Sequence, residues 1–516
     1  MTFLGVNDPQ DLDPDEVERL EHLLESPIRI NGMSESELRS CGLFSPYQVA
    51  VISDYIERHG DIMSLTELSL LDGFGELFVR KVAPFVSLKS YESASSCIRH
   101  EVAVRGGSRW QNGCDGNYGA KYRMELNDKF TAVFAASRSV GSESWFPSAY
   151  SGSIAWKFQK VPVRIFAGDF NARFGQGLVL WNNSFINTLT DPDAFMKKPT
   201  GISQPWSFTG ANSLHGLAAE WSTASIKVSA VAAFEELLFS PAVNVAWHGR
   251  YGQTSVTCSM SKIGADAAFC LRGVNMFGEF VYNWSEGIPA VLMGTRFRAG
   301  ESLDMAYLAR VFPKDQYSAA AACVYTFDKK GQITLSADAT YYPVSKAKED
   351  LYSVQVKSQL SCDILLSEAW KIKCRLSERY RTWGHPFRTD VRTDVSYTRA
   401  PFVLTVRMNV LNCDGTGYLS YVEGGFVNDK ISMYLRQGVF CVDDWDDRIY
   451  VYERDAPGSF TSPAMYGRGL WTSFTSGIKL ISSLKLYARA SYLCYPFMEK
   501  KKPGKAELKL QLHYRF

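Results

Sequence analysis

No stretch of this 516-residue sequence contains about 18 consecutive apolar residues, the length that a membrane-spanning helix needs. The motifs of common enzyme sites are also missing: there is no His-Glu-x-x-His, no Gly-x-Ser-x-Gly and no Walker loop. A Ser-x-x-Lys match at residues 259–262 lies on an expected strand without its companion motifs, so we attribute it to chance. The sequence therefore predicts neither an enzyme nor a cofactor.

Metal-binding patterns are equally scarce. The seven histidines are dispersed, and the eleven cysteines occur singly, with no Cys-x-x-Cys and no histidine at metal spacing. An odd number excludes complete pairing within the chain, so we expect free thiols inside strands, where cysteine behaves as a small apolar residue. The acidic cluster Asp443-Asp444-Trp445-Asp446-Asp447 offers oxygen ligands for Ca²⁺, but we favour a solvated acidic loop and expect no metal.

The first fifteen residues have neither the basic segment nor the apolar segment of a signal peptide. We expect a mature or trimmed sequence. A cytoplasmic protein is the alternative, and it would exclude the membrane location argued below.

Strict alternation of apolar and polar side chains is abundant, and it is clearest in the last ten residues. Leu508, Leu510, Leu512, Tyr514 and Phe516 alternate with polar residues, which is the period of a strand with one apolar and one polar face. This strand resembles the closing strand of bacterial outer-membrane β-barrels in its C-terminal position and its final Phe. The resemblance implies that Tyr514 and Phe516 form the signal read by the barrel-assembly machinery.

Apart from a single interruption, the same alternation continues through the chain after about residue 97, for example over residues 332–341 and 402–410. Over residues 387–398 the polar face is charged. Four charges on one strand face need water or each other, so we expect a wet lumen in which neighbouring charges pair. A solvated outer face of a soluble sheet is the alternative. The four residues are Arg388, Asp390, Arg392 and Asp394.

Counting alternating segments between turn signals gives about 22 to 26 strands, and even numbers are usual in such barrels. We therefore predict a large antiparallel transmembrane β-barrel over residues 96–516, with both termini in the periplasm. The 13% of aromatic residues can supply two interfacial girdles, and a mean hydropathy of -0.14 suits a barrel with a polar lumen.

Alternation stops between Gly175 and Gly210, a segment that contains three prolines. Loops of this length usually have a function, so we expect either a plug or constriction inside the lumen or an extended surface loop. The glycine-rich residues 168–178 that lead into it resemble a segment of barrels fused to helix-hairpin-helix domains in diderm bacteria.

Residues 1–90 have helical periodicity instead. Ser34 and Glu37 have the spacing of a capping box, which places a helix start there. Further helices are expected over residues 15–25, 46–59, 64–71 and 76–84. We predict a small all-α domain of short helices joined by tight turns.

This domain resembles the tandem helix-hairpin-helix domain of competence-type DNA-binding proteins, over about 60 residues. In that family each hairpin carries Gly-hydrophobic-Gly, whose backbone amides contact a DNA phosphate. Gly73-Phe74-Gly75 fits the pattern, and Arg80 and Lys81 follow as phosphate partners. The first hairpin, which begins at Gly42, has Phe44 in place of the second glycine, so one hairpin of the two fits.

The charge of this domain opposes DNA binding. Residues 1–90 contain sixteen acidic and seven basic residues, a net charge of -9, whereas nucleic-acid modules normally present a basic surface. We therefore favour a protein-docking module over a DNA-binding one.

The expected function is that of a non-enzymatic outer-membrane barrel whose periplasmic module docks a partner in envelope assembly or transport. DNA binding or uptake and a solute channel are the alternatives. Outer-membrane lipid surrounds such a barrel, and the basic turn at residues 500–502, with Lys505, could contact lipopolysaccharide. A periplasmic protein or DNA would bind through residues 1–90.

Overall fold

The computed structural model describes most of the chain. The described residues are 19–20, 22–24, 27–89, 98–127, 129–142, 144–158, 160–182, 189–208, 212–235, 238–300, 302–327, 330–346, 352–498 and 502–516. Parts of four predictions fall outside them: the start of the first helix, the boundary at residues 90–96, part of the segment 175–210, and Lys500 with Lys501.

The wall is a closed barrel of 24 antiparallel strands, which confirms the predicted fold class. Its strands are β3 (Ile98–Trp110), β4 (Cys114–Leu126), β5 (Phe130–Arg138), β6 (Ala149–Lys157), β7 (Val163–Arg173), β9 (Leu214–Ser222), β10 (Ile226–Glu235), β11 (Leu238–Gly249), β12 (Gly252–Ser259), β13 (Lys262–Leu271), β14 (Val274–Asn283), β15 (Ile288–Ala299), β16 (Leu303–Phe312), β17 (Gln316–Phe327), β18 (Gly331–Tyr342), β19 (Ser353–Leu365), β20 (Trp370–Arg381), β21 (Phe387–Arg399), β22 (Phe402–Asn412), β23 (Thr416–Val427), β24 (Ile431–Val442), β27 (Gly467–Ile481), β28 (Leu484–Cys494) and β29 (Lys505–Arg515).

The barrel closes between its last and first strands. In β29, Tyr514 lies opposite Val102 of β3, and the backbones of Phe516 and His100 exchange hydrogen bonds of 2.8 and 3.0 Å. Closure leaves no free strand edge, so each strand of the wall has two paired neighbours.

Side chains alternate between the two faces of this wall as the sequence predicts. In β29, Leu510 is 49% exposed on the outer face whereas its neighbour Gln511 is 3% exposed on the inner face. Aromatic rings pair across strand ends on the outside, as Trp370 does with Tyr397 at 4.9 Å between ring centroids. An apolar outer band flanked by aromatic rings is the arrangement of a transmembrane β-barrel.

The charged face of β21 points inward, and its charges pair with neighbours as expected. Asp390 pairs with Arg375 of β20 at 3.3 Å, and Asp394 pairs with both Arg392 and Arg407. The ten cysteines among the described residues are free thiols.

The helical module, residues 27–89, contains four of the five helices that the sequence predicts, and the described residues of the fifth, 19–20 and 22–24, are helical as well. The four are α2 (Glu35–Ser40), α3 (Pro46–His59), α4 (Leu65–Leu70) and α5 (Glu76–Val82), with the 3-10 turns η3 (Ile30–Gly32) and η4 (Ala83–Phe85). A short parallel pair, β1 (Ile28–Arg29) with β2 (Val86–Ser87), joins its ends. Capping boxes at Ser34 and Ser45 start α2 and α3, and a buried core holds the helices together. No helix in the described part of the chain is long and apolar enough to cross a membrane.

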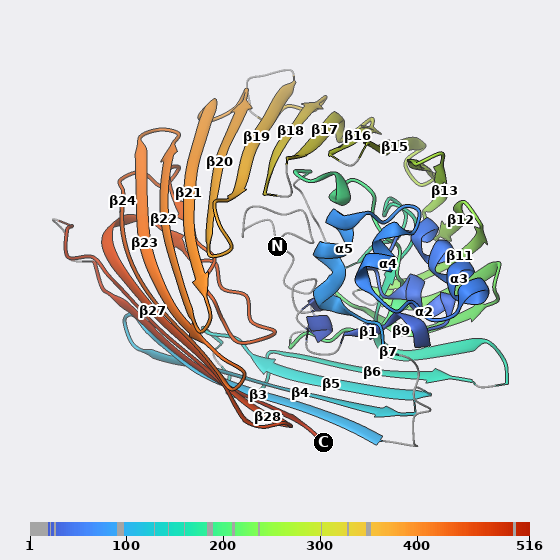
Figure 1. Cartoon of the computed structure of the whole chain (residues 1–516), viewed down its shortest axis with the longest axis horizontal. Helices are drawn as coiled ribbons and strands as arrows, with labels where there is room; N and C mark the ends of the chain where they lie inside the picture. Colours follow the sequence, from blue (N-terminus) through green and yellow to red (C-terminus); the bar gives the residue numbers. More distant parts are fainter. Residues whose placement is uncertain are drawn as a thin grey trace.

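The helices lie inside the ring of strands, beside β11 to β15 and away from β20 to β24 (Figure 1). The described residues between β7 and β9, which are 174–182, 189–208 and 212–213, also lie inside (Figure 1); we call them the luminal loop. It contains η5 (Pro192–Ala194) and β8 (Gly201–Ser203), and β8 pairs with β7.

A second interruption of the alternation was not predicted. Residues 443–466, between β24 and β27, form an inward insertion with the short pair β25 (Ile449–Tyr450) and β26 (Ala464–Met465). Its Phe460 packs against the core of the helical module, and its Pro457 carbonyl accepts a hydrogen bond of 2.7 Å from Gln511 of the wall. The expectation of a single interruption after residue 97 is therefore wrong. We call residues 443–466 the inner insertion.

Candidate functional site in the barrel lumen

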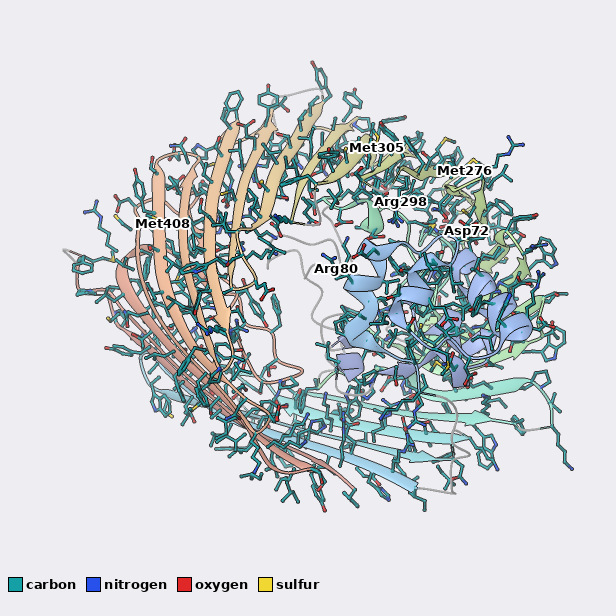
Figure 2. All side chains as sticks on the ribbon, viewed as in Figure 1. Asp72, Arg80, Met276, Arg298, Met305 and Met408 are labelled. Atoms are coloured by element: carbon teal, nitrogen blue, oxygen red, sulfur yellow. The ribbon has the colours of Figure 1, made fainter. Side chains whose placement is uncertain are left out.

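The predicted phosphate-binding hairpin joins α4 to α5 and faces the barrel wall. Gly73 and Gly75 have φ of 79° and 76°, a conformation that favours glycine, and Phe74 between them is buried in the module's core. Arg298 of β15 donates to the Phe74 carbonyl at 3.1 Å. A Cβ built on Gly75 would overlap the Arg298 guanidinium, so the close approach that glycine permits here is used by the protein's own wall. Figure 2 shows Arg298 on the inner side of the wall, next to the helices.

Arg80 and Lys81 have different surroundings. Arg80 pairs with Glu76 at 3.0 Å one turn back on α5, and both side chains are more than half exposed. It lies at the edge of the module toward the middle of the ring (Figure 2). Lys81 is largely buried, and its Nζ lies 2.9 Å from a carboxylate oxygen of Asp191 and 2.9 Å from one of Asp193, both in the luminal loop. Burial opposes the charge of Lys81, but the two carboxylates overcome it and raise the pKa of Lys81.

These contacts continue into the wall. Asp193 pairs with Arg296 of β15, and Arg296 donates to Asp304 of β16 at 2.6 and 3.1 Å. The charges of Arg296 and Lys81 hold the pKa of Asp193 below its usual range against the effect of burial, which raises it. Helical module, luminal loop and wall are therefore joined through one set of paired charges. We call it the luminal charge network: Lys81, Asp191, Asp193, Arg296, Arg298 and Asp304.

The first hairpin also contacts the luminal loop. Gly42 has φ of 68°, and a Cβ there would lie 3.0 Å from a methyl carbon of Thr200. The carbonyl of the next residue, Leu43, accepts a hydrogen bond of 2.7 Å from Lys198. On α2, Glu37 accepts from Lys157 at the end of β6, at 2.7 Å. Both predicted hairpins thus contact parts of the same chain inside the barrel.

The luminal loop is fixed to the wall by a buried carboxylate. Glu279 of β14 accepts from the backbone amides of Gln176 and Leu178 at 2.7 and 3.1 Å. Further along, Phe195 and Met196 pack with small and apolar wall residues of β13 to β17. The glycine-rich lead-in thus brings its backbone close to a wall carboxylate, and Phe195 and Met196 fill space against the wall.

A cavity of about 600 Å³ remains between the luminal loop and strands β15 to β19. Six cationic and two acidic side chains line it: Arg19, Arg173, Lys197, Lys198, Arg310, Lys357, Asp193 and Asp338. Burial lowers the pKa of Lys197 and of Lys198 to about 8. This luminal cavity suits anions better than cations because basic side chains outnumber acidic ones.

The acidic cluster at residues 443–447 belongs to the inner insertion and is not a solvated loop throughout. Asp447 is fully buried and accepts from the backbone amides of Cys413 and Gly415, each at 2.6 Å, while Asp443 pairs with Arg468 at 2.6 Å. The expectation of a solvated loop is wrong for Asp447, because these amides at the end of β22 hold its carboxylate. The described residues contain no group of side chains arranged to hold a metal ion.

The residues of the predicted assembly signal lie at the barrel seam. The rings of Tyr514 and Phe516 stack at 4.9 Å between centroids on the outer face, and the Phe516 ring stacks on His100 at 4.8 Å. They are accessible from outside the barrel, as a recognition signal requires. Recognition by the assembly machinery stays a prediction.

Sequence reasoning missed Asp191, Asp193, Arg296 and Arg298. Asp191-Pro192-Asp193 begins a 3-10 turn, and the Asp191 side chain caps it at 3.0 Å, a local signal that was readable. The two arginines alternate inward on β15, but nothing local tells which segment they meet.

No protein-family model matches the chain, and no curated protein matches its sequence. Among solved structures, it is similar to the siderophore receptor PirA from Acinetobacter baumannii, with 6% identity, a TM-score of 0.46, and 82% of this chain and 81% of that chain covered. It is also similar to the siderophore receptor PirA from Pseudomonas aeruginosa, with 7% identity, a TM-score of 0.45, and 82% of this chain and 81% of that chain covered. The translocation pore of the P pilus usher PapC is similar as well, with 8% identity, a TM-score of 0.41, and 81% of this chain and 99% of that chain covered. With TM-scores this low, the assignment as a large antiparallel barrel depends on the chain's own strand pairing.

Proposed function

We propose that this chain is an outer-membrane barrel of the transport type whose lumen is closed by its own helical module and luminal loop. The observation that carries the proposal is the position of Lys81 between Asp191 and Asp193, with Asp193 also paired to Arg296 of the wall. Such buried charges are costly to separate, so the module is held in the lumen until something competes for these contacts. The N-terminal module would enter from the periplasm, since both termini are on one side of an even-stranded barrel.

Docking is then the role of the hairpins, and their first partner is the barrel itself. The glycine at position 75 admits Arg298 where a phosphate would lie in a DNA complex, and Lys81 has two carboxylates in place of a nucleic-acid backbone. A periplasmic partner in transport or envelope assembly would act by engaging the module and releasing it. Docking of the module within the barrel, and its release by a partner, would extend the docking function expected from the sequence, and neither step requires DNA.

Conductance in planar bilayers tests the proposal. The wild-type protein should give a closed trace with rare openings, because in this proposal the helical module and the luminal loop obstruct the lumen. The double variant Lys81→Ala with Arg298→Ala should open more often, because it removes the contacts that hold the second hairpin and α5 in the lumen. A large, steady conductance of the wild type would contradict the closed state and favour a simple solute channel.

DNA uptake is the second candidate, and salt dependence separates it from docking. Binding of the full-length protein to duplex DNA should be absent if the module docks within the barrel. A binding constant that falls steeply with salt, and that Arg80→Ala abolishes, would instead support DNA handling.

A further inference from the structure

A second pocket lies on the opposite side of the lumen from the helices, where the inner insertion meets strands β20 to β24. Its volume is about 300 Å³. Ten of its lining residues come from the wall, and Tyr452 and Arg454 come from the insertion. We call it the arginine pocket.

Cations outnumber carboxylates in this pocket. Its cationic side chains are Lys371, Lys373, Arg392, Arg407, Arg436 and Arg454. The two carboxylates among its lining residues are those of Asp394 and Glu423. The surplus positive charge faces a confined space, where an anion is attracted more strongly than in open solvent.

Each carboxylate is shared between two guanidinium groups. Asp394 accepts from Arg392 at 2.9 Å and also from Arg407, and Lys373 lies directly opposite it in the neighbouring strand. Because one carboxylate lies among two or three cationic side chains, the ion pairs do not neutralise the pocket, and it stays electropositive.

Glu423 repeats this arrangement on the next pair of strands. It accepts from Arg436 at 2.7 Å and from Arg454 at 2.9 Å. Below the pocket the two lysines share a third carboxylate, since Asp363 lies 3.0 Å from Lys371 and 3.8 Å from Lys373.

The wall next to the pocket even places like charges opposite each other. Arg375 is directly opposite Arg392, and four residues along, Arg379 is directly opposite Arg388. Like charges at such positions destabilise a sheet. This concentration of arginine therefore has a cost for the fold, which a function in anion binding would explain.

The guanidinium groups at the base are held in place. Arg436 and Glu423 are each only 5% exposed, and the Tyr421 ring lies under Arg436 at 4.4 Å and under Arg407 at 5.1 Å from its centroid. At the mouth, Lys371 and Arg454 are 44% and 42% exposed and can adjust to a ligand. A fixed base and a mobile rim are suited to binding a small solute.

We propose that the arginine pocket binds a small oxyanion with several negative charges, of the pyrophosphate or phosphate-ester class. Planar guanidinium groups bind phosphate oxygens through paired hydrogen bonds, and a volume near 300 Å³ admits a small solute and not a macromolecule. That this anion is a solute in transit rests on the proposed function, whereas its binding does not.

The test is calorimetric titration of inorganic pyrophosphate into the full-length protein in detergent, at constant ionic strength to hold screening fixed. We expect saturable binding that weakens about tenfold or more in Arg454→Gln with Lys371→Gln, each an exposed rim residue. Arg454→Lys should recover part of the affinity because it keeps the charge and loses the planar group.

Arg468→Gln is the matched control, because Arg468 is a half-exposed arginine paired with Asp443 and does not line the pocket. It should bind pyrophosphate as the wild type does. Absence of saturable binding to the wild type, or equal binding by the rim double variant, would overturn the proposal.

The titration needs no open lumen, so it is independent of the conductance experiment. A protein that binds pyrophosphate yet shows steady conductance would keep the pocket and remove the closed-barrel proposal. A closed barrel without saturable pyrophosphate binding would support the closed-barrel proposal and overturn the proposal for the arginine pocket.

Discussion

The guanidinium group of Arg298 occupies the space that a side chain on Gly75 would need. A Cβ at Gly75 would overlap the arginine nitrogen, and the Phe74 carbonyl beside it accepts the hydrogen bond of Arg298. The hairpin and the wall are thus complementary in shape at Gly75, where the absence of a side chain leaves room for Arg298.

Replacement of this glycine should loosen the module. In Gly75→Ala the residue must keep φ near 76°, which costs about 1–2 kcal/mol, and Arg298 must also move. We expect more frequent openings in planar bilayers. Gly60→Ala is the matched control, because Gly60 has φ of 84° and no atom within 4 Å of its would-be Cβ. Equal effects of the two substitutions would show that the contact with Arg298 contributes nothing.

Loss of Lys81 should release the module far more than loss of its neighbour. Lys81→Ala leaves Asp191 and Asp193 buried without this cation, at a cost of about 3 kcal/mol, so amide hydrogens of α5 should exchange about 100-fold faster. Arg80→Ala removes an exposed pair with Glu76 and should change exchange little. Similar exchange rates in the two variants would show that the buried ion pairs of Lys81 do not hold the module in place.

Alkaline pH should strengthen the packing of the luminal loop. Burial lowers the pKa of Lys197 and Lys198 to about 8, whereas both titrate near 10.4 when unfolded. Below pH 8 both states are protonated and the penalty for the buried charges is complete. Between about pH 8 and 10.4 the folded state has lost protons that the unfolded state still binds, so stability rises with pH.

Urea unfolding at pH 7, 8, 9 and 10 measures this effect. The increase, at most about 1.4 kcal/mol per pH unit for each lysine, should be absent in Lys197→Met with Lys198→Met. A double variant with the same pH dependence as the wild type would assign the effect to other groups.

Deletion of Phe516 should impair assembly. The residue ends the strand that closes the barrel, and its ring is exposed where it stacks on Tyr514 and His100. We expect a smaller folded fraction in membranes, measured by the mobility shift between unheated and heated samples in electrophoresis. Phe497→Ala removes an equally exposed Phe from the loop between β28 and β29 and should assemble normally.

The sequence was informative wherever a pattern is local. Alternation gave the strands and their faces, as at Leu510 and Gln511, and Ser34 with Glu37 marked the start of α2. The strand number fell within the expected range because turn signals separate the segments.

Contacts distant in sequence could not be predicted in this way. Lys81 and Asp193 are 112 positions apart, and an exposed phosphate ligand and a buried ion-pair lysine look identical in a single sequence. The inner insertion did leave a readable signal, because alternation stops after Val442 and resumes at Gly467. It was missed because its acidic start was treated as an ordinary loop.

The pairing of β29 with β3 determines when the molecule can be completed. Strand β3 directly follows the helical module in the sequence, whereas its partner β29 belongs to the other end of the wall, so the seam joins strands that are far apart in the sequence. Pairing of such distant strands is slow, because the entropy of closing the long loop between them is lost before the new contacts stabilise it. A circularly permuted chain that moves the seam would make this pairing local while keeping the contacts of the wall, and it should therefore close its ring faster.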